Sequence, residues 1–377
     1  MKIAIEAQRI FRKHKHGMDF VVLELIKQIQ RLDTRNEYLI LVAPGPDRCL
    51  EETPNVHILE VKCPTYPLWE QWALPATLDK IRPDLVHCTS NTAPVQLNFP
   101  LVLTLHDIIY LEKRKRPSQS LYQNMGWYYR KWNVPKILSK CAKIITVSQF
   151  ERNRIQHALN LNSDILTAIY NGVGAHFKPI PEPWYRTQRY IEAREYLFFL
   201  GNTDPKKNAS GVFKAYDHYL KQSNKKLPLL IADLELGYVE GMLKQLNLMH
   251  LLPHLALPGY LSNLDLPSIY SGANVFLYPS LRESFGIPIL EAMACGTPVI
   301  TSNTSSMPEV AGPEACLVDP EQPIEIANQL LKIENDATYR NTIIQYGLHR
   351  AAQFSWEHTA RSILNIYQEI YNKNKGI

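Results

Sequence analysis

The sequence has no apolar stretch long enough to cross a bilayer as a helix. Hydrophobic residues make up 45% of its 377 residues and charged residues 20%, an ordinary globular balance. No run approaches the roughly 20 uninterrupted apolar residues that a membrane-spanning helix needs. The N-terminal residues also lack the basic region, apolar core and cleavage site of a signal peptide. We therefore expect a cytoplasmic protein that is not integral to a membrane.

Cysteine is scarce and carries no pattern. The six cysteines are scattered, and none belongs to a C-x-x-C pair. This excludes the usual zinc motifs and gives no sign of a disulfide framework. D-x-D is also missing, and its nearest approximation is Asp233-Leu234-Glu235. We expect no catalytic metal.

The glycine-rich phosphate loops of common nucleotide enzymes are absent as well. The first apolar segment, residues 2–7, is followed by nine residues without glycine and then by a single Gly17, so no G-x-G-x-x-G follows it. No P-loop, G-x-S-x-G or H-E-x-x-H occurs either. These absences disfavour a nicotinamide or flavin enzyme, a P-loop enzyme, and the hydrolases that carry such motifs.

Short apolar runs separated by helical segments are plentiful, and they occur in two series. Several are continuous rather than alternating, which is typical of parallel strands buried on both faces. The expected strands are residues 2–7, 38–43, 56–61, 85–88, 101–105 and 143–147, then 196–200, 227–232, 275–278, 298–301 and 316–318. A proline-rich stretch at 178–183 separates the series and reads as a linker.

The pattern predicts an α/β protein with two doubly wound, Rossmann-like domains that face each other across a cleft. We place the N-terminal domain at 1–180 and the C-terminal domain at 181–358, with a final helix at 359–377 packing back on the N-terminal domain. Ligands of such sheets bind outside the carboxyl ends of the strands. The loops that follow the strands are therefore where the chemistry is expected.

The loop after residues 275–278 has the features of an anion site. Pro288 and Gly296 bracket a short helix, so free N–H groups near Phe285, Gly286 and Ile287 face the loop. Two carboxylates, Glu283 and Glu291, flank this site and would accept hydrogen bonds from hydroxyls. A phosphate between hydroxyl-bearing rings describes a nucleotide sugar. Spacing alone leaves open that Glu291 only complements the helix dipole and that Glu283 is a solvated loop residue.

A longer stretch carries a family resemblance. It comprises residues 266–280, 283–291, 292–300 and 307–312, with weaker matches at 105–107, 171–173, 200–208 and 354–356. These segments closely resemble the retaining glycosyltransferases of the GT-B fold in glycosyltransferase family four. The general likeness is to bacterial mannosyltransferases that build surface polysaccharides.

The resemblance implies a role for each residue of the loop and its surroundings. Glu283 would hold sugar hydroxyls and Glu291 the ribose diol, while the basic pair for the diphosphate falls on Lys206 and Lys207. Relatives commonly have arginine at one of these two places, so a bidentate grip is replaced by point charges. The remaining implied donor contacts are Phe285, Gly286 and Ile287 at the helix start, Gly259 and Tyr260 facing the base, and Gly17 near the distal phosphate.

The residue after residues 101–105 is His106, which in the family contacts the donor sugar. Taken alone, a His-Asp pair after a strand is more often a loop anchor. The resemblance further implies same-face transfer with retention of configuration, in which His106, Glu283 and Lys207 are the residues closest to the reaction. No carboxylate is assigned as a nucleophile.

The N-terminal domain is expected to bind the acceptor. Residues 1–170 carry 23 Lys and Arg against 16 Asp and Glu, a net +7, and the remainder is −2. The basic run 113–116 and the aromatic-basic stretch 121–132 would allow peripheral contact with an anionic membrane through 113–132, at the inner face of the plasma membrane. The alternative is a solvated charge run followed by a buried helix.

We therefore expect a hexosyltransferase that uses a nucleotide sugar as co-substrate and needs no cofactor. GDP-mannose is the first donor hypothesis and a UDP-hexose the second, and the acceptor is a glycan or lipid-linked oligosaccharide rather than a nucleic acid. The alternatives are a nucleotide-sugar epimerase or phosphorylase on the same fold, or a non-catalytic protein that binds glycans or lipid surfaces.

Overall fold

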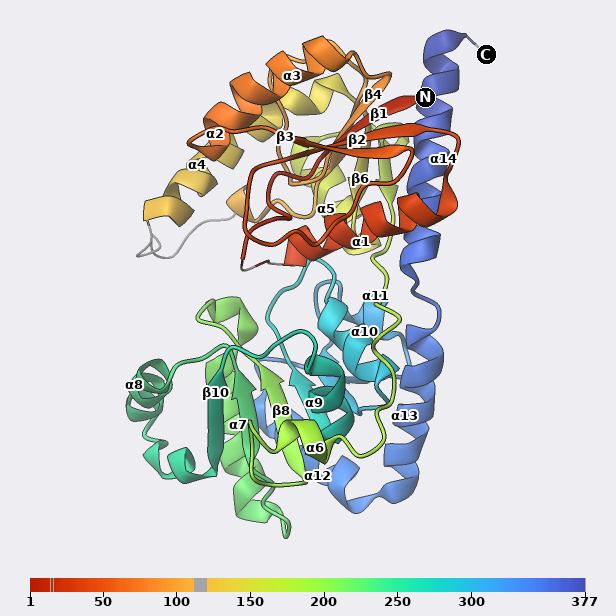
Figure 1. The fold of residues 1–377 in the computed structure, drawn as a ribbon. Coiled ribbons are helices and arrows are strands. Elements are labelled where there is room, and N and C mark those ends of the chain that lie inside the picture. The colour runs from red at the N-terminus through yellow and green to blue at the C-terminus, as the bar shows by residue number, and fades with distance from the viewer. Residues whose placement is uncertain (14, 16, 112–120, 377) are drawn as a thin grey trace. The chain divides into compact units, whose positions relative to one another are not determined.

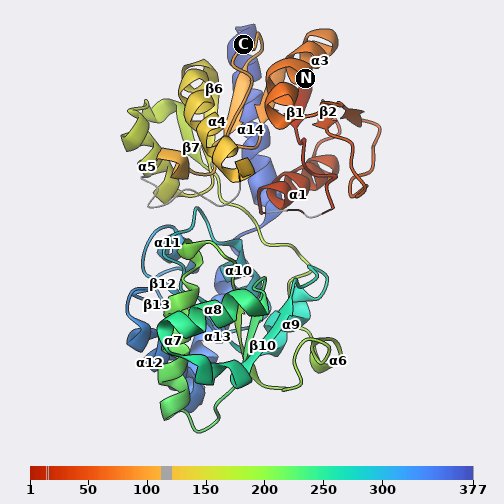
Figure 2. The same cartoon turned by 90° about the vertical axis from the view of Figure 1, so that its left-hand side faces the viewer.

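The computed structural model describes residues 1–13, 15, 17–111 and 121–376. The basic run 113–116, named above, lies outside this part of the chain. The chain forms two compact units, of which unit 1 comprises residues 1–172 with 356–377 and unit 2 comprises 173–355. Each unit is an α/β sandwich with its own core, and Figures 1 and 2 show helices on both faces of each sheet.

Unit 1 is built on a fully parallel sheet in the order β3-β2-β1-β4-β5-β6-β7. Its strands are β1 (Lys2–Glu6), β2 (Glu37–Val42), β3 (Val56–Glu60), β4 (Leu85–Cys88), β5 (Leu101–Thr104), β6 (Cys141–Thr146) and β7 (Leu166–Ala168). The strands are apolar at successive positions because both faces of the sheet are covered. In β1, Ile3 and Ile5 enter one core cluster while Ala4 enters the other.

The helices of unit 1 cover these two faces. They are α1 (Gly17–Leu32), α2 (Tyr66–Leu68), the π-helix η1 (Trp69–Ala73), α3 (Leu74–Ile81), α4 (Leu121–Ile137), α5 (Gln149–Leu159) and α14 (Trp356–Lys375), with 3-10 turns η2 (Ile109–Leu111), η3 (Leu138–Lys140) and η4 (Ser163–Ile165). The last helix, α14, packs against α1, and buried Tyr367 places its hydroxyl 2.6 Å from Nδ1 of buried His87 on β4.

Unit 2 has a second fully parallel sheet in the order β10-β9-β8-β11-β12-β13. Its strands are β8 (Tyr196–Leu200), β9 (Leu229–Ala232), β10 (Leu255–Gly259), β11 (Ala273–Tyr278), β12 (Val299–Ser302) and β13 (Cys316–Val318). Its helices are α6 (Trp184–Thr187), α7 (Ala209–Gln222), α8 (Leu236–Leu246), α9 (Leu266–Gly272), α10 (Ile287–Ala294), α11 (Met307–Ala311), α12 (Pro323–Asn335) and α13 (Ala337–Ala351), with 3-10 turns η5 (Pro205–Lys207) and η6 (Met249–His254).

The two-sheet α/β architecture expected from the sequence is confirmed, and two strands were not foreseen. Strand β7 has only three residues, and β10 is half-buried and contains Pro258 and Gly259. Thr167 interrupts β7, and Pro258 and Gly259 follow only three apolar residues in β10, so both strands give a weak apolar signal.

The chain passes from unit 1 to unit 2 earlier than the proline-rich stretch. Val173 pairs with Ser355 in an isolated parallel bridge, and the Ile180 N–H donates to Ser271 Oγ at 3.0 Å. The segment 173–180 is therefore held by unit 2 instead of by unit 1. The chain returns to unit 1 between Ser355 and Trp356. None of the described helices is long and apolar enough to span a bilayer.

Candidate functional site

The unit 2 sheet reverses its strand order between β8 and β11. The chain places β9 and β10 on one side of β8, then β11, β12 and β13 on the other. In open parallel sheets, ligands bind at the carboxyl ends of the strands where the order reverses. Loops 201–208 and 279–286 leave the sheet at this point. These two loops therefore form the candidate site.

The first loop is fixed by polar side chains. Asp204 caps the turn Pro205–Lys207 by accepting from the Lys206 N–H at 3.1 Å. Asn208 Nδ2 donates to the carbonyl oxygens of Pro279, at 3.0 Å, and Pro320, at 2.7 Å. Since Pro279 belongs to the second loop, this amide ties the two loops together beneath the lysines of the turn.

The second loop is held from two sides. The Leu281 N–H donates to the Lys206 carbonyl at 2.7 Å. On the other side, Ser305 Oγ accepts from the Glu283 N–H at 3.2 Å and lies 2.6 Å from the Glu283 carbonyl, to which Ser306 Oγ donates at 2.9 Å. The backbone of Glu283 is therefore fixed independently of its side chain.

The side chains of Lys207 and Glu283 meet between these loops. Lys207 Nζ donates to Glu283 Oε1 at 2.7 Å and to the Tyr278 hydroxyl at 2.9 Å. Burial alone would raise the pKa of the Glu283 carboxyl, but the charges of Lys207 and Lys206, together with hydrogen bonds from Lys207 and Ser280, lower that pKa. Glu283 is therefore an anion near neutral pH and can accept hydrogen bonds from hydroxyls.

The second loop ends at the N-terminus of α10. Gly286 caps this helix with φ +105°, and Ile287 is its first residue. Pro288 is therefore the second helical residue, whereas the sequence predicted it as the first. The N–H groups of Gly286 and Ile287 make no hydrogen bond to any residue that the structure describes. Free N–H groups and the positive end of the helix dipole together favour an anion at this place.

Glu291 lies one turn into α10. The Tyr270 hydroxyl of α9 donates to Glu291 Oε2 at 3.1 Å. Burial raises the pKa of the Glu291 carboxyl to about 7, and the hydrogen bond from Tyr270 only partly opposes this shift. Burial, and then the charges of Glu283 and Glu291, raise the pKa of the Tyr278 hydroxyl, so both carboxylates act on this tyrosine.

The other residues expected in the donor site lie in two settings. Phe285 is buried and its ring packs edge-on against Phe354, with 6.1 Å between centroids, so only its backbone faces the loop chemistry. Gly259, with φ +74°, ends β10, and Tyr260 after it is 65% exposed. Strand β10 is separated from β8 by β9, so Gly259 and Tyr260 follow a strand farther from the switch point than the strands that precede Lys207 and Glu283.

His106 lies in unit 1, just after β5. Its side chain is buried, and Nε2 lies 2.9 Å from the Thr89 carbonyl. A carbonyl only accepts, so Nε2 carries the proton and Nδ1 carries the lone pair of the neutral ring. Burial is the main cause that lowers the pKa of His106, which keeps the ring neutral.

Gly17 is the first residue of α1, at the far end of the loop after β1. A Cβ atom built on Gly17 would meet no atom within 4 Å, and its φ is not positive. Glycine is therefore not required there by the described structure. The structure gathers Lys206, Lys207, Glu283, Gly286, Ile287 and Glu291 within unit 2, and His106 and Gly17 within unit 1.

Sequence reasoning missed Tyr278, Tyr270 and the two serines that hold the second loop. Tyr278 ends β11, so the rule that chemistry follows the carboxyl ends of strands was enough to find it. Tyr270 and Ser305 act from other elements, and no local pattern connects them to Glu291 or Glu283.

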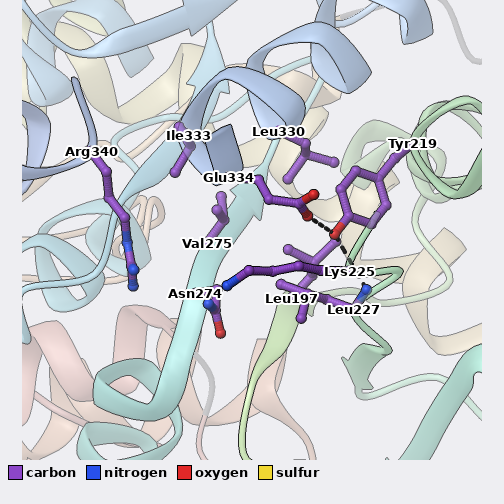
Figure 3. A pocket seen from close by; sticks show the side chains of 10 residues that line it. All are labelled: Leu197, Tyr219, Lys225, Leu227, Asn274, Val275, Leu330, Ile333, Glu334 and Arg340. Atoms are coloured by element: carbon purple, nitrogen blue, oxygen red, sulfur yellow. Dashed lines mark hydrogen bonds between the residues drawn. The ribbon is translucent and has the colours of Figure 1, made fainter. Parts of the chain in front are cut away.

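A small pocket in unit 2 lies away from these loops. Its lining comes from the amino ends of β8 and β11 and from α7, α12 and α13, as Figure 3 shows. There the Tyr219 hydroxyl donates to Glu334, and the Leu227 N–H donates to the Tyr219 hydroxyl at 3.3 Å. We interpret it as a gap between packed helices, because none of the loop residues discussed above lines it.

Two family models match the chain. Residues 185–350 match the model described as glycosyl transferases group 1, and residues 16–176 match glycosyltransferase family 4. The O-antigen chain mannosyltransferase B of Escherichia coli is 30% identical over 283 residues, which is 71% of this chain and 70% of the relative. The chain belongs to the group 1 glycosyltransferases of family four.

A second relative of this glycosyltransferase is longer. The serotype-specific mannosyltransferase WbdA of Escherichia coli is 27% identical over 307 residues, or 77% of the chain. That match spans only 37% of the length of WbdA.

Solved structures share the fold of this glycosyltransferase. Sucrose-phosphate synthase from Thermosynechococcus elongatus aligns with a TM-score of 0.77, 21% identity and 99% coverage of both chains. Anabaena HepE, solved in complex with UDP and glucose, aligns with a TM-score of 0.73 and 20% identity over 98% of this chain and 99% of HepE. These likenesses show that the glycosyltransferase has the GT-B fold.

Membership of the family does not decide whether the enzyme uses a metal ion. Within the residues that the structure describes, no group of three or more His, Cys, Asp or Glu side chains is arranged to hold a metal ion. Metal independence of this glycosyltransferase stays a prediction.

Proposed function

We propose that this glycosyltransferase moves a hexose, with mannose as the first hypothesis, from a nucleoside diphosphate sugar to a glycan or lipid-linked acceptor. The transfer retains the anomeric configuration and needs no metal ion. A role in the synthesis of cell-surface polysaccharide follows from the same reasoning, because two relatives are named for O-antigen or serotype-specific mannosyl transfer.

One observation supports the donor assignment above the others. Lys207 and Glu283 are in contact at 2.7 Å at the switch point, next to a helix N-terminus with free N–H groups. The cation and the N–H groups match a diphosphate, while the ionised carboxylate matches sugar hydroxyls. Glu291, one turn into α10, is the residue that we propose accepts hydrogen bonds from the ribose diol.

The proposed chemistry relies on stabilising the leaving group. When the bond from the anomeric carbon to the diphosphate breaks, negative charge accumulates on the departing phosphate. In this proposal Lys207, Lys206 and the start of α10 stabilise this charge, which a metal ion would otherwise do. The departing phosphate then takes the proton of the acceptor hydroxyl, which attacks from the same face.

The identity of the transferred sugar is the most specific part of the proposal. GDP-mannose is favoured by the names of the relatives, and a UDP-hexose is the second candidate because HepE was solved with UDP and glucose. Tyr260 is exposed near the end of β10, and it is our candidate for contact with the base.

Donor hydrolysis tests the proposal directly. The protein is incubated with GDP-mannose, UDP-glucose and other nucleotide sugars in the presence of a metal chelator, and released nucleoside diphosphate is measured. We expect release from GDP-mannose above all, and a strong loss of release in Glu291→Ala. A Glu291→Ala variant that binds and turns over donor as well as the parent contradicts the assignment, and restoration of activity only by divalent metal contradicts the metal-free mechanism.

Peripheral contact with an anionic membrane is part of the same proposal. Helix α4 exposes Met125, Tyr128 and Trp132, and Lys136 Nζ lies 4.3 Å from the centre of the Trp132 ring. Residues 121–137 contain no acidic side chain. Aromatic and basic groups on one helix are typical of helices that lie at the surface of an anionic bilayer. Trp72 of η1 belongs to the same unit and is 75% exposed, so it adds a further exposed aromatic side chain.

Vesicle binding tests the membrane contact. We expect sedimentation with vesicles that contain phosphatidylglycerol, little with pure phosphatidylcholine, and release by salt. Replacing the four basic residues at 113–116 by glutamine should abolish the binding, whereas Lys221→Gln and Lys225→Gln on unit 2 should not. Binding that is insensitive to salt and to the 113–116 substitutions overturns this part of the proposal.

A further inference from the structure

The unit 1 sheet has its own switch point, between β1 and β4. Glu6 ends β1, and its buried carboxylate accepts from the Thr89 N–H at 3.3 Å just after β4. The loop that follows is unusual because Thr89, Ser90, Asn91 and Thr92 are all buried. Four successive polar residues at a switch point place hydrogen-bonding groups where sheets of this type take ligands.

Asn91 has the most constrained position in this loop. It is fully buried, with φ +70°, and its N–H donates to the Thr104 carbonyl at 3.1 Å. Its Oδ1 accepts from the His106 N–H at 2.6 Å. Because an N–H must point at an acceptor, this contact fixes which end of the amide is oxygen.

The other end of the Asn91 amide is unused. Nδ2 is buried and has no hydrogen-bond partner among the described residues. A buried donor left unpaired costs roughly 1–3 kcal/mol. Asn133, equally buried on α4, shows the usual alternative, since its Nδ2 donates to the Ala93 carbonyl at 2.8 Å and its Oδ1 accepts from the Ala93 N–H at 3.3 Å.

A second buried polar group at this edge of the sheet is also unpaired. The Tyr110 hydroxyl, on the segment after β5, has no hydrogen-bond partner in the described part of the chain. Strands β4 and β5 are adjacent and parallel, so the segments after them leave the same edge. Two unpaired donors, on the segments that follow β4 and β5, therefore point to a ligand that supplies oxygen atoms.

The charges around His106 favour a neutral ligand. Asp107 follows His106 directly, and the Glu6 carboxylate contacts the loop through the Thr89 N–H. The positive charges of Arg9 and Arg130 also act on the His106 ring, in the opposite sense to Asp107. Arg9 is paired with Asp19 at 3.5 Å, and buried Glu70 accepts from the Thr92 hydroxyl, so groups of both signs surround this loop. A sugar hydroxyl fits, because it accepts from an amide and can donate to the lone pair on His106 Nδ1.

We propose that Asn91 is a specificity residue whose Nδ2 donates to one hydroxyl oxygen of a pyranose ring, while its Oδ1 holds the backbone of His106. The inference rests on the proposed hexosyl transfer, and it adds a residue that reads one particular hydroxyl. The pyranose is either the transferred sugar or the sugar at the acceptor end, and the experiment separates the two.

The test compares the parent with Asn91→Asp. Aspartate keeps the oxygen that faces His106 and replaces the two N–H donors by a second carboxyl oxygen. The donor arm measures hydrolysis of GDP-mannose and its 2-, 3-, 4- and 6-deoxy forms, and the acceptor arm measures transfer to methyl α-mannoside and its deoxy forms. In the parent, loss of the hydroxyl read by Asn91 should lower kcat/KM about 10- to 100-fold, as 1–3 kcal/mol implies.

In Asn91→Asp, that same analogue should be used as well as the natural sugar, and the arm in which this happens identifies the source of the pyranose. Asn91→Gly, which accepts φ +70° without strain, should give the same result if aspartate disturbs folding. Asn133→Asp removes an equally buried amide that is already paired, and it should leave every ratio between analogues as in the parent.

Unchanged ratios in both arms for Asn91→Asp and Asn91→Gly overturn the inference, as does the same loss of discrimination in Asn133→Asp. A parent that turns over no nucleotide sugar contradicts the proposed function instead. In that case binding still decides the role of Asn91: methyl α-mannoside should raise the unfolding temperature of the parent and not of Asn91→Gly, and equal shifts overturn it.

Discussion

Lys207 provides a charge that helps to keep the largely buried Glu283 carboxylate ionised and that would face the proposed diphosphate. Lys207→Met removes the charge at nearly constant length. We expect kcat/KM for the donor to fall roughly 10²–10³-fold, in line with the loss of one preorganised electrostatic donor. The pKa of Glu283 should rise, because burial is then less opposed. Steady-state release of nucleoside diphosphate is the measurement.

The matched control for this lysine is Lys221→Met on α7. Lys221 is 64% exposed and pairs with Asp217 one turn away, outside the two loops. Its loss should leave turnover within about twofold, since exposed pairs contribute little. Lys207→Met with turnover equal to this control contradicts the assigned role.

Glu291 makes binding of the nucleoside depend on pH. Its pKa of about 7 means that the carboxylate is mostly protonated at pH 6 and mostly ionised at pH 8. Only the ionised form accepts from both hydroxyls of a ribose diol. The affinity for GDP should therefore increase about tenfold from pH 6 to pH 8, by calorimetric titration. Glu291→Gln should remove most of this increase, and an identical pH profile contradicts the role.

The same carboxyl affects stability with a defined sign. Its pKa is raised in the folded state from an ordinary value of 4.5, so the unfolded chain ionises first. Stability should fall as pH rises from about 4.5 to about 7, and the loss is complete above that range. Comparing the unfolding of parent and Glu291→Gln across this range isolates the contribution of Glu291.

At the scale of elements, the turn from β11 into α10 depends on one glycine. Gly286 has φ +105°, and a Cβ there would lie 3.0 Å from Ile289 Cδ1. Gly286→Ala should cost about 1–2 kcal/mol in stability and weaken binding of GDP, because the N–H groups at the helix start shift. Urea unfolding and calorimetry measure the two effects.

Gly241→Ala is the control for this substitution. Gly241 lies within α8, and a Cβ there would meet no atom within 4 Å. Alanine should stabilise that helix by roughly 0.5–1 kcal/mol and leave GDP binding unchanged. If Gly286→Ala binds GDP like this control, the helix start is not the anion site.

The elements that the sequence predicted are those with a strong local signal. Continuous apolar runs located most strands because both faces of each sheet are buried, and Pro288 with Gly296 located α10 within one residue. Lys207 and Glu283 could be named, yet their contact could not, because it joins loops 76 residues apart in the chain. Asn91 was missed altogether, since a buried unpaired amide is visible only in three dimensions.

At the scale of the whole molecule, the two units have separate cores. Ile366 of α14 belongs to the unit 1 core, and Leu330 of α12 belongs to that of unit 2. Truncating either side chain to alanine should cost about 2–5 kcal/mol. In hydrogen exchange, Ile366→Ala should lower protection in 1–172 and 356–376 and spare 173–355, while Leu330→Ala should do the reverse. Equal loss throughout contradicts two separable cores.

Helix α14 completes unit 1 with residues that follow unit 2 in the sequence. Unit 2 is continuous, so every residue it needs has been synthesised once position 355 is made. The face of the unit 1 sheet that carries Ile3 and Ile5 stays uncovered by α14 until residues 356–375 have been made. On the ribosome, the unit that carries Lys207 and Glu283 can therefore be complete before the unit that carries His106.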